Sequence, residues 1–363
     1  MKKNAVSTLS ALLCVLMLLS ACGAPAGSSQ SASQSAEPSV SALAPVSVPD
    51  PEPVFANPLT GEETSTDLSA QRPVAIMLNN LKKALPQLGV SQAALIYEAP
   101  AEGGITRMMA VFQSLDGVGN LGSVRSARPY YVEMAAGLDA IYIHAGGSDG
   151  AYASIKKLSV SNIDGVNGPH GGTMFWRDAA RRKNAGFEHS LLTSGERIQA
   201  LLSGKLSSMR QTHEAGYALP LSFTADGTPT AGNAAHTITL HWSNYKTGVF
   251  RYDTASGTYL VEEYGAPYVD GNTDTQVAVT NVLVIHTGVK NIPGDTDGRK
   301  DISLTGSGTG YFACGGKYIP IRWEKSSATA PFRFLTADGQ PLSLGVGKSY
   351  INVADPSYPL TFE

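Results

Sequence analysis

Short apolar runs, separated by polar residues and turn signals, form the main pattern of the chain after about residue 68. The first four occupy residues 74–78, 94–98, 108–113 and 140–144. Continuous apolar runs of this length are typical of strands that are buried on both faces of a sheet. Before the fourth run, residues 129–137 begin with Pro and end with Gly, which is typical of a helix. Strands that alternate with helices predict an α/β domain with a mixed sheet over residues 69–214.

The pattern changes after residue 235. From there the chain consists of short strand-like runs, and the pairs Gly315-Gly316 and Asp338-Gly339 are typical of tight hairpin loops. This predicts an all-β, barrel- or sandwich-like domain over residues 236–357. Residues 215–235 show no clear periodicity and are interpreted as a linker. The expected fold class is therefore α/β or α+β, with an N-terminal α/β domain followed by an all-β C-terminal domain.

The N-terminus has the pattern of a secretory signal. Two lysines precede an apolar run over residues 9–19, which is too short for a membrane-spanning helix. The run ends in Leu19-Ser20-Ala21-Cys22, which resembles the lipobox of bacterial lipoproteins. By that resemblance residues 1–21 are a signal peptide, and the lipidated Cys22 anchors the protein to the cell membrane on its extracytoplasmic side. An ordinary secretion signal with a chance cysteine is the alternative.

The segment that follows has the composition of a tether. Residues 22–68 are rich in Ser, Ala and Pro and contain few large apolar side chains. Such a segment has little apolar surface to bury, so its ordering entropy is not offset. We therefore expect a disordered tether between the lipidated cysteine and the folded part.

Length and composition limit the possible functions. The 363 residues suit about two domains, and a net charge of −3 gives no basic footprint for nucleic acid. Two of the three cysteines lie within the first 22 residues, so Cys314 is alone in the folded part and no cysteine metal site is expected there. The seven histidines show no paired zinc spacing. The sequence therefore predicts neither a metal nor a cofactor.

Charged residues gather between the second apolar run and the predicted helix. They are Glu98, Glu102, Arg107, Arg125 and Arg128. The segment from Arg125 through Ser126 to Arg128 directly precedes the helix, and arginines at a helix N-terminus are suited to binding an anion. The alternative is a set of internal ion pairs that fix loops to the sheet, because charges near a core must be paired. Both interpretations remain open at this point.

Two polar residues complete the candidate ligand site. Asn79 follows the first apolar run, and His144 ends the fourth and opens a Gly-rich loop. The carboxyl ends of strands are where α/β folds bind ligands. A partly buried histidine with internal partners is an equal alternative for His144. No catalytic residue is assigned.

The order of several motifs is similar to that of a known family. RPVAIMLNN, ALIYEAPAEGGITR, GSVRSAR, DAIYIHAGGS, FWRD and GSGTGYF occur in this order. They resemble the YerB-like bacterial lipoproteins, which contain the domain of unknown function numbered 3048 in an N-terminal and a C-terminal part. The resemblance covers about residues 69–356 and implies a membrane-anchored protein of two domains, without an established activity.

A second resemblance concerns the first half of the chain. ITRMMAVFQS, GSVRSARPYYVEMA and LDAIYIHAGGS are similar in order to segments of the LytR-CpsA-Psr enzymes. These transfer glycopolymers from polyprenyl pyrophosphate to peptidoglycan, with arginines and acidic residues around the pyrophosphate and a divalent metal. Arg107 and either Arg125 or Arg128 match arginine positions, but Ser126 and Pro129 stand where those enzymes carry an acidic residue.

Two functions from different classes follow from these observations. The first is a cell-surface lipoprotein that binds an anionic envelope component, such as peptidoglycan or a polyprenyl phosphate, or a protein partner, through an arginine-lined cleft. The alternative is a LytR-CpsA-Psr-like phosphotransferase that acts on a glycopolymer linked to polyprenyl pyrophosphate. The binding protein is the preferred hypothesis, and a purely structural interaction module is a third possibility.

Overall fold

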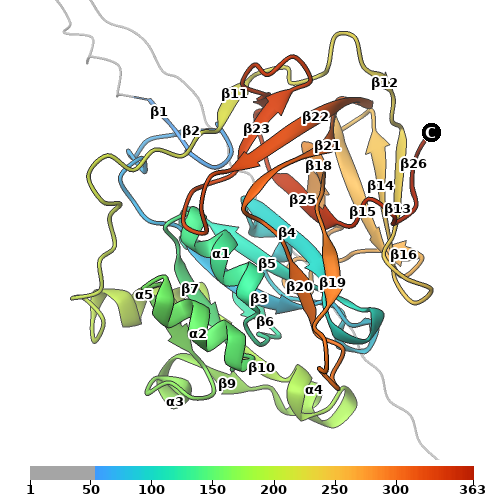
Figure 1. The fold of residues 1–363 in the computed structure, drawn as a ribbon. Helices are drawn as coiled ribbons and strands as arrows, with labels where there is room; N and C mark the ends of the chain where they lie inside the picture. The colour runs from blue at the N-terminus through green and yellow to red at the C-terminus, as the bar shows by residue number, and fades with distance from the viewer. Residues whose placement is uncertain (1–53) are drawn as a thin grey trace, which may run out of the picture. The chain divides into compact units, whose positions relative to one another are not determined.

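An eleven-stranded sheet runs through the centre of the structure, a computed structural model that describes residues 54–363 (Figure 1). The predicted signal peptide, the predicted lipid attachment residue Cys22 and the tether up to residue 53 lie outside the described residues. The segment just before residue 69 is ordered, with a two-stranded hairpin, β1 (Phe55–Ala56) and β2 (Glu63–Thr64), and a buried Leu59.

The large sheet takes strands from both halves of the chain. In spatial order they are β12 (Asn233–Ala234), β22 (Lys317–Lys325), β21 (Gly306–Cys314), β18 (Asn281–His286), β25 (Ser349–Ala354), β4 (Leu95–Pro100), β5 (Thr106–Phe112), β3 (Val74–Asn79), β7 (Ile141–His144) and β8 (Asn162–Asp164), with β23 (Arg333–Thr336) beside β22. The two halves meet where β25 pairs in parallel with β4 on one side and with β18 on the other.

The predicted fold class is wrong. Strand is the main regular secondary structure of the described residues, which contain five α-helices, and neither large sheet is closed into a barrel. The apolar runs of the first half do form the buried strands β3, β4, β5 and β7. However, the free edge of β4 is covered by β25, which comes from the C-terminal half. Local periodicity identifies a buried strand but not the distant strand that pairs with it, and so an α/β domain was expected.

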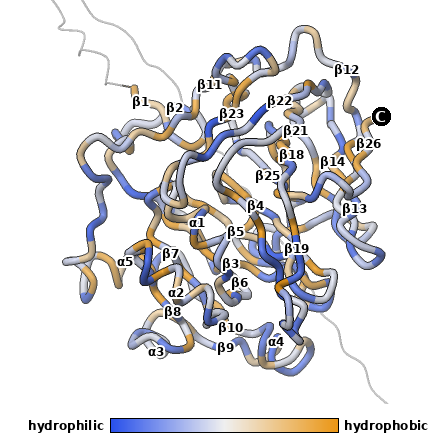
Figure 2. Tube along the Cα trace, viewed as in Figure 1, coloured by the Kyte–Doolittle hydropathy of each residue, from blue (hydrophilic) through white to orange (hydrophobic). Residues whose placement is uncertain are grey.

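Both faces of the large sheet are covered by apolar side chains. Successive residues of a strand point to opposite faces, and Met77 lies in one core cluster while its neighbour Leu78 lies in the other. In the same way Tyr97 and Ile96 of β4 belong to different clusters. Figure 2 shows hydrophobic residues concentrated in the middle of the body and hydrophilic residues mostly in peripheral loops.

Helices of the N-terminal half cover one part of the sheet (Figure 1). The α-helices are α1 (Pro129–Gly137), α2 (Asp149–Lys157), α3 (Gly171–Met174), α4 (Ala179–Asn184) and α5 (Gly195–Ser203). The buried Tyr131 fixes α1 to the strands, because its hydroxyl accepts a bond from Ala99 N at 3.0 Å and donates one to Arg107 O. Among residues 54–363 no helix is long and apolar enough to cross a membrane.

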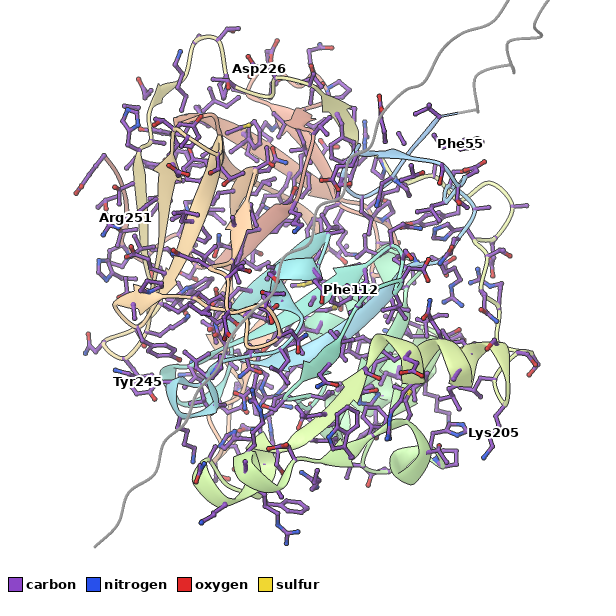
Figure 3. The ribbon with its side chains drawn as sticks, turned by 180° about the vertical axis from the view of Figure 1, so that it is seen from behind. Phe55, Phe112, Lys205, Asp226, Tyr245 and Arg251 are labelled. Atoms are coloured by element: carbon purple, nitrogen blue, oxygen red, sulfur yellow. The ribbon has the colours of Figure 1, made fainter. Side chains whose placement is uncertain are left out.

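Smaller sheets surround the large one. A six-stranded sheet consists of β16 (Ala266–Pro267), β15 (Thr258–Glu263), β14 (Thr247–Asp253), β13 (Thr237–His241), β26 (Leu360–Phe362) and β17 (Ala278–Val279). The others are β6 (Asn120–Gly122) with β10 (Leu191–Ser194) and β9 (Trp176–Arg177), β11 (Ser222–Thr224) with β24 (Ser343–Gly345), and β19 (Val289–Asn291) with β20 (Lys300–Ile302). Seen from behind, Phe112 of β5 lies in the interior while Lys205 and Arg251 lie at the periphery (Figure 3).

Candidate functional site

The segment 122–128 lies across the carboxyl ends of β3 and β7. These parallel strands pair only over their first residues, and the segment enters between them beyond that point. Arg125 N donates to Met77 O of β3 at 3.0 Å, and Ala145 N, just after β7, donates to Arg125 O at 3.0 Å. The sheet therefore holds Arg125 beside the ends of β3 and β7, which carry Asn79 and His144.

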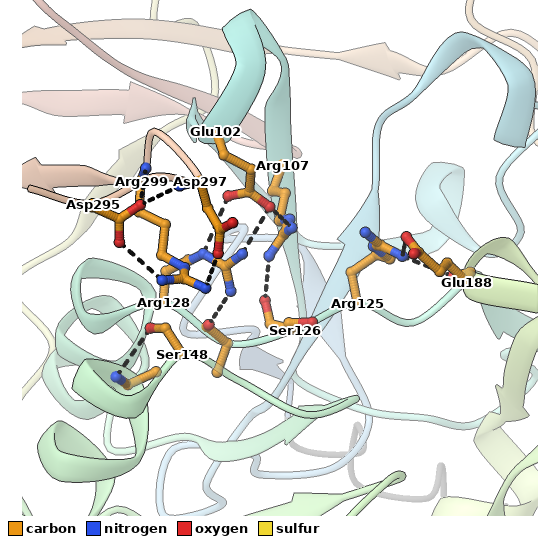
Figure 4. A network of polar contacts seen from close by, with 12 residues as sticks. Glu102, Arg107, Arg125, Ser126, Arg128, Ser148, Glu188, Asp295, Asp297 and Arg299 are labelled. Atoms are coloured by element: carbon orange, nitrogen blue, oxygen red, sulfur yellow. Dashed lines mark hydrogen bonds and ion pairs between the residues drawn. The ribbon is translucent and has the colours of Figure 1, made fainter. Parts of the chain in front are cut away.

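Glu102 holds two of the predicted arginines. It lies in the turn η3 (Glu102–Gly104) between β4 and β5. Arg128 donates to it twice, from Nη2 to Oε1 at 2.7 Å and from Nε to Oε2 at 3.2 Å. Arg107, in β5, donates from Nη2 to the same Oε1 and from Nη1 to Ser126 O at 3.0 Å. One carboxylate thus serves two guanidinium groups (Figure 4).

The side chains of this cluster are largely buried, and burial disfavours their charged forms. The exposed fractions of the side chains are 2% for Arg107, 8% for Arg128 and 22% for Glu102. Burial, followed by the positive charge of Arg128, lowers the pKa of Arg107 to about 10. Burial alone would raise the pKa of Glu102, but the charges of Arg107 and Arg128 outweigh it and lower that pKa. The cluster of Arg107, Arg128 and Glu102 therefore holds one positive charge in excess.

The tip of the β19–β20 hairpin approaches this cluster from the C-terminal half (Figure 4). Within the tip, Arg299 Nη1 donates to Asp295 at 2.8 Å, and Nη2 donates to Asp297. The bond to Asp295 raises the pKa of Arg299, and the carboxylate of Glu102 adds a smaller effect in the same direction. The tip has two carboxylates and one guanidinium, so its charge balances that of the cluster.

A cavity of about 450 Å³ lies beside the cluster, between α1 and the hairpin. Pro129 and Tyr130, which follow Arg128 directly, form one wall, and Ile292 and Pro293 lie among the residues of the other. The remaining lining residues are Glu133, Lys290, Asn291, Lys300, Asp301 and Ile302. This space combines apolar walls with two lysines and two carboxylates.

Arg125 lies apart from the other two arginines. Its Nη1 donates to the backbone oxygen of Glu188 at 2.9 Å and to the carboxylate of Glu188 at 3.2 Å. Figure 4 shows this pair separated from the Glu102 cluster. The structure therefore divides the predicted arginine set into two places, with Arg107 and Arg128 in one and Arg125 in the other.

Asn79 belongs to the same side as Arg125. Its Nδ2 donates to His189 Nδ1 at 2.7 Å and to Ser123 Oγ at 3.3 Å. Burial, and then the charges of Arg125 and Lys83, lower the pKa of His189, so its imidazole is neutral at pH 7 and accepts this bond. The sequence prediction did not include His189, whose only signal was its place just before an apolar pair.

Glu98 is enclosed in a second buried cluster. It accepts bonds from Asn80 Nδ2 at 2.8 Å and from the Tyr350 hydroxyl, and Lys246 Nζ lies 3.3 Å from its Oε1. Lys246 also pairs with Glu263, and burial lowers the pKa of Lys246 to about 8 despite the attraction of Glu98. These residues join β4 to the C-terminal half. Lys246 and Glu263 were not predicted, since a lysine in a turn between strands is typical of an exposed position.

His144 has internal partners at both ring nitrogens. Nδ1 lies 2.9 Å from Gly146 O and Nε2 lies 3.2 Å from Asn162 Oδ1. The ring stacks on Tyr142 with a centroid separation of 5.2 Å. His144 therefore holds the Gly-rich loop in place, in keeping with the second of the two alternatives that the sequence left open.

Across residues 54–363, no set of three or more His, Cys, Asp or Glu side chains is arranged to hold a metal ion. Cys314, in β21, is buried and free. The guanidinium groups of Arg107 and Arg128 are of the kind that pairs with phosphate and carboxylate oxygens.

Comparisons with known proteins place this geometry in context. Residues 59–209 match the N-terminal domain, and residues 238–351 the C-terminal domain, of a family described as "Protein of unknown function (DUF3048)". A Bacillus subtilis protein named "Putative lipoprotein YerB" is 32% identical over 311 residues, which are 84% of this chain and 88% of that protein. The crystal structure of YerB protein from Bacillus subtilis superposes with a TM-score of 0.72 at 28% identity, covering 85% of this chain and 99% of that chain.

Proposed function

Because this chain belongs to the YerB-like family and carries both DUF3048 domains, we propose that it is a membrane-anchored lipoprotein that binds an anionic component of the cell envelope at Arg107 and Arg128. In this proposal Cys22 is the lipid attachment site, and residues 1–21 are the signal peptide. The lipobox-like sequence before Cys22 and the name of the Bacillus subtilis relative support the anchor. The binding site rests on the geometry of the Glu102 cluster.

The observation that carries the proposal is the sharing of one carboxylate by two largely buried guanidinium groups. Arginine forks match phosphate and carboxylate oxygens, and a phosphate with two negative charges would balance both arginines. Glu102 therefore occupies the position that an external anion would take. A ligand that displaced Glu102 would replace a single negative charge by a double one.

The turn that carries Glu102 is suited to such a displacement. Gly103 and Gly104 both have positive φ values, 67° and 76°, and no atom lies within 4 Å of the space that a side chain at Gly103 would occupy. Glu102 itself is 22% exposed, so its carboxylate has an open route to solvent. Rotation of Glu102 outward would leave Arg107 and Arg128 facing the incoming anion.

The cavity beside α1 indicates the class of ligand. An anion at Arg128 would extend toward Pro129 and Tyr130, which form an apolar wall of this cavity, with Lys290 and Lys300 among the other lining residues. The two lysines are offset in charge by Glu133 and Asp301, so the apolar walls of this cavity fit the apolar part of an amphiphilic phosphate, such as a polyprenyl phosphate, rather than a free inorganic anion. Peptidoglycan stem carboxylates are the second ligand class in this proposal.

The phosphotransferase alternative has less support. An enzyme of that kind needs a carboxylate that is free to act on the substrate or on a metal. Glu98 is buried and bonded to Lys246, and Glu102 is bonded to Arg107 and Arg128. The geometry therefore favours binding over catalysis.

The proposed site can be tested by thermal shift with inorganic pyrophosphate and farnesyl phosphate as probes. The mature chain from residue 22 and its variants are each compared with their own unliganded Tm. We expect Arg107→Gln and Arg128→Gln to abolish the shift, and Glu102→Gln to tighten binding roughly tenfold, which is about 1.4 kcal/mol. Arg125→Gln is the matched control and should keep the wild-type response.

Two outcomes would overturn the proposal. One is a wild-type shift that persists in the Arg128→Gln variant. The other is a Glu102→Gln variant that binds both probes more weakly than the wild type, because the carboxylate would then support the ligand instead of occupying its place. A larger shift with farnesyl phosphate than with pyrophosphate would identify the cavity as part of the site.

A further inference from the structure

Seven basic residues, which we call the basic face, gather around α4. They are Lys82, Lys83, Arg125, Arg177, Arg181, Arg182 and Lys183. They come from the short helix η1 (Lys82–Ala84), the segment 122–128, β9 and α4. The acidic residues of the same elements and of η4 (Phe187–His189) are Asp178 and Glu188. This leaves an excess of five positive charges, in a chain whose net charge is −3.

Direct contacts hold the basic face together. Arg181 of α4 donates to Ala84 O at 3.0 Å and to Pro86 O, so α4 packs against the residues that follow Lys83. Glu188 pairs with Arg125, and both Arg125 and Lys83 are close enough to lower its pKa. The basic residues therefore form one surface, although they are about 100 residues apart in the sequence.

An exposed aromatic ring lies within this surface. Phe187 is 54% exposed. The guanidinium carbon of Arg177 lies 3.5 Å from its ring centroid and that of Arg182 lies 5.4 Å from it. Arg177 Nη1 also donates to Phe187 O at 2.7 Å. A large apolar side chain between arginines is typical of residues that insert at a membrane interface, where the ring reaches the acyl boundary and the charges meet headgroups.

The most exposed basic side chains of this face have no ion-pair partner among the described residues. Lys82, Lys83, Arg182 and Lys183 are exposed, and none forms an ion pair within residues 54–363. Distributed cations of this kind fit a broad anionic surface, since each basic residue near such a surface raises the binding constant about fivefold.

We propose that the basic face docks onto anionic phospholipid headgroups of the membrane that anchors the chain, with Phe187 entering the interface. The proposal rests on the proposed lipid anchor but not on the Arg107–Arg128 site. A lipid at Cys22 holds the chain near the membrane without orienting the body. The basic face would supply the orientation and turn α4 toward the bilayer.

The length of the chain before the described residues permits this orientation. β1 lies at the end of the body away from α4 (Figures 1 and 3). A body of this size is roughly 50 Å across. The chain from Cys22 to Val54 can span at most about 110 Å at ~3.4 Å per residue. This reach exceeds the body, so the distance from β1 does not prevent α4 from meeting the membrane.

Vesicle sedimentation tests the docking without the anchor. The mature chain with Cys22→Ser carries no acyl group, so any binding must come from the protein surface. We expect it to sediment with vesicles that contain phosphatidylglycerol and not with phosphatidylcholine vesicles, and binding should weaken as salt rises because exposed charges are screened. Lys82→Glu, Lys83→Glu, Arg182→Glu and Lys183→Glu together should lower binding at least a hundredfold.

Matched variants distinguish the effect of this surface on vesicle binding from the effects of net charge and of misfolding. Lys205→Glu, Lys317→Glu, Arg322→Glu and Arg333→Glu change the total charge equally at exposed positions elsewhere and should bind at least tenfold more tightly than the basic-face variant. The same four basic-face positions changed to Gln give a milder variant, whose Tm should match the wild type while binding is lost. Phe187→Ala should weaken binding severalfold.

The docking proposal fails if the wild type binds neutral vesicles equally, or if the basic-face variant binds like the control variant. It also fails if the wild type binds soluble heparin but no vesicles, which would indicate a polyanion as the partner. Arg107 and Arg128 are unchanged in these variants. Failure of the docking proposal would therefore not affect the outcome of the pyrophosphate test at those two arginines.

Discussion

Arg128 binds Glu102 through two nitrogen atoms, with Nη2 2.7 Å from Oε1 and Nε 3.2 Å from Oε2. Arg107 shares the same carboxylate. The three groups are therefore not equivalent. Loss of one arginine leaves a paired glutamate, whereas loss of the carboxylate leaves two guanidinium groups facing each other in a largely buried place.

The first prediction concerns this asymmetry. Glu102→Gln should lower the free energy of unfolding by roughly 2–3 kcal/mol, somewhat less than for a fully buried pair because Glu102 is partly exposed. Arg128→Gln should cost about 1–2 kcal/mol, since Arg107 still pairs with the carboxylate. Urea denaturation of both variants checks this order. Equal costs would show that the two arginines do not depend on the same carboxylate.

The second prediction concerns the buried lysine between the two halves of the chain. Lys246→Met should cost about 3–5 kcal/mol, because Glu98 and Glu263 then lose a buried counter-charge. Adding Glu263→Gln to Lys246→Met should recover part of that loss. Urea denaturation measures both variants, and Lys205→Met, at the periphery, is the control (Figure 3). A double variant that is less stable than the sum of the single changes would contradict this coupling.

The third prediction concerns acid sensitivity. Burial would raise the pKa of Asp164, but hydrogen bonds from the Tyr152 hydroxyl at 2.6 Å and from Gly146 N and Val166 N, both at 2.8 Å, outweigh it and lower that pKa. A lowered folded-state pKa contributes stability that is present above the unfolded value of about 3.9 and is lost as pH falls below it. The Tm should therefore fall as pH drops below about 4.

Variants at this carboxylate give the control for the pH profile. Asp164→Asn should lower the Tm at pH 6 and flatten its decline between pH 4 and pH 3. Tyr152→Phe should have a smaller effect, because it removes one of three donors. A profile in Asp164→Asn that is as steep as that of the wild type would assign the acid sensitivity to other groups.

The fourth prediction concerns the start of α2, beside the arginine cluster. Ser148 Oγ accepts a bond from Ala151 N at 3.3 Å and caps the helix. Ser148→Ala should cost about 1 kcal/mol, and Ser148→Asp should retain most of the stability because aspartate is also a good cap. Thermal unfolding distinguishes the two. A Ser148→Asp variant as unstable as Ser148→Ala would mean that the hydroxyl acts in another way.

Local features of the structure could be predicted from the sequence because their signals are local. The apolar runs that begin at residues 74, 94, 108 and 140 form β3, β4, β5 and β7, and the predicted helix 129–137 is α1 (Pro129–Gly137). Pro at the start and Gly at the end mark such a helix without reference to any partner.

The arrangement of these elements could not be predicted in the same way. Leu95 of β4 pairs with Ser349 of β25, and nothing in either segment specifies the other. The clustering of charge around β5 was visible, but whether Arg125 lies with Glu102 or with Glu188 depends on how the segment 122–128 passes between β3 and β7. Spacing along the chain does not contain that information.

The position of β4 between β5 and β25 also determines when the sheet can be completed. β5 follows β4 almost directly, but β25 begins only at Ser349, close to the end of the chain. A polypeptide that emerges from the ribosome or from a secretion pore with its N-terminus first must leave one edge of β4 uncovered until that residue has appeared. Completion of the sheet therefore waits until residues 349–354 have been synthesised, so β4 and β5 must persist with one open edge through most of synthesis.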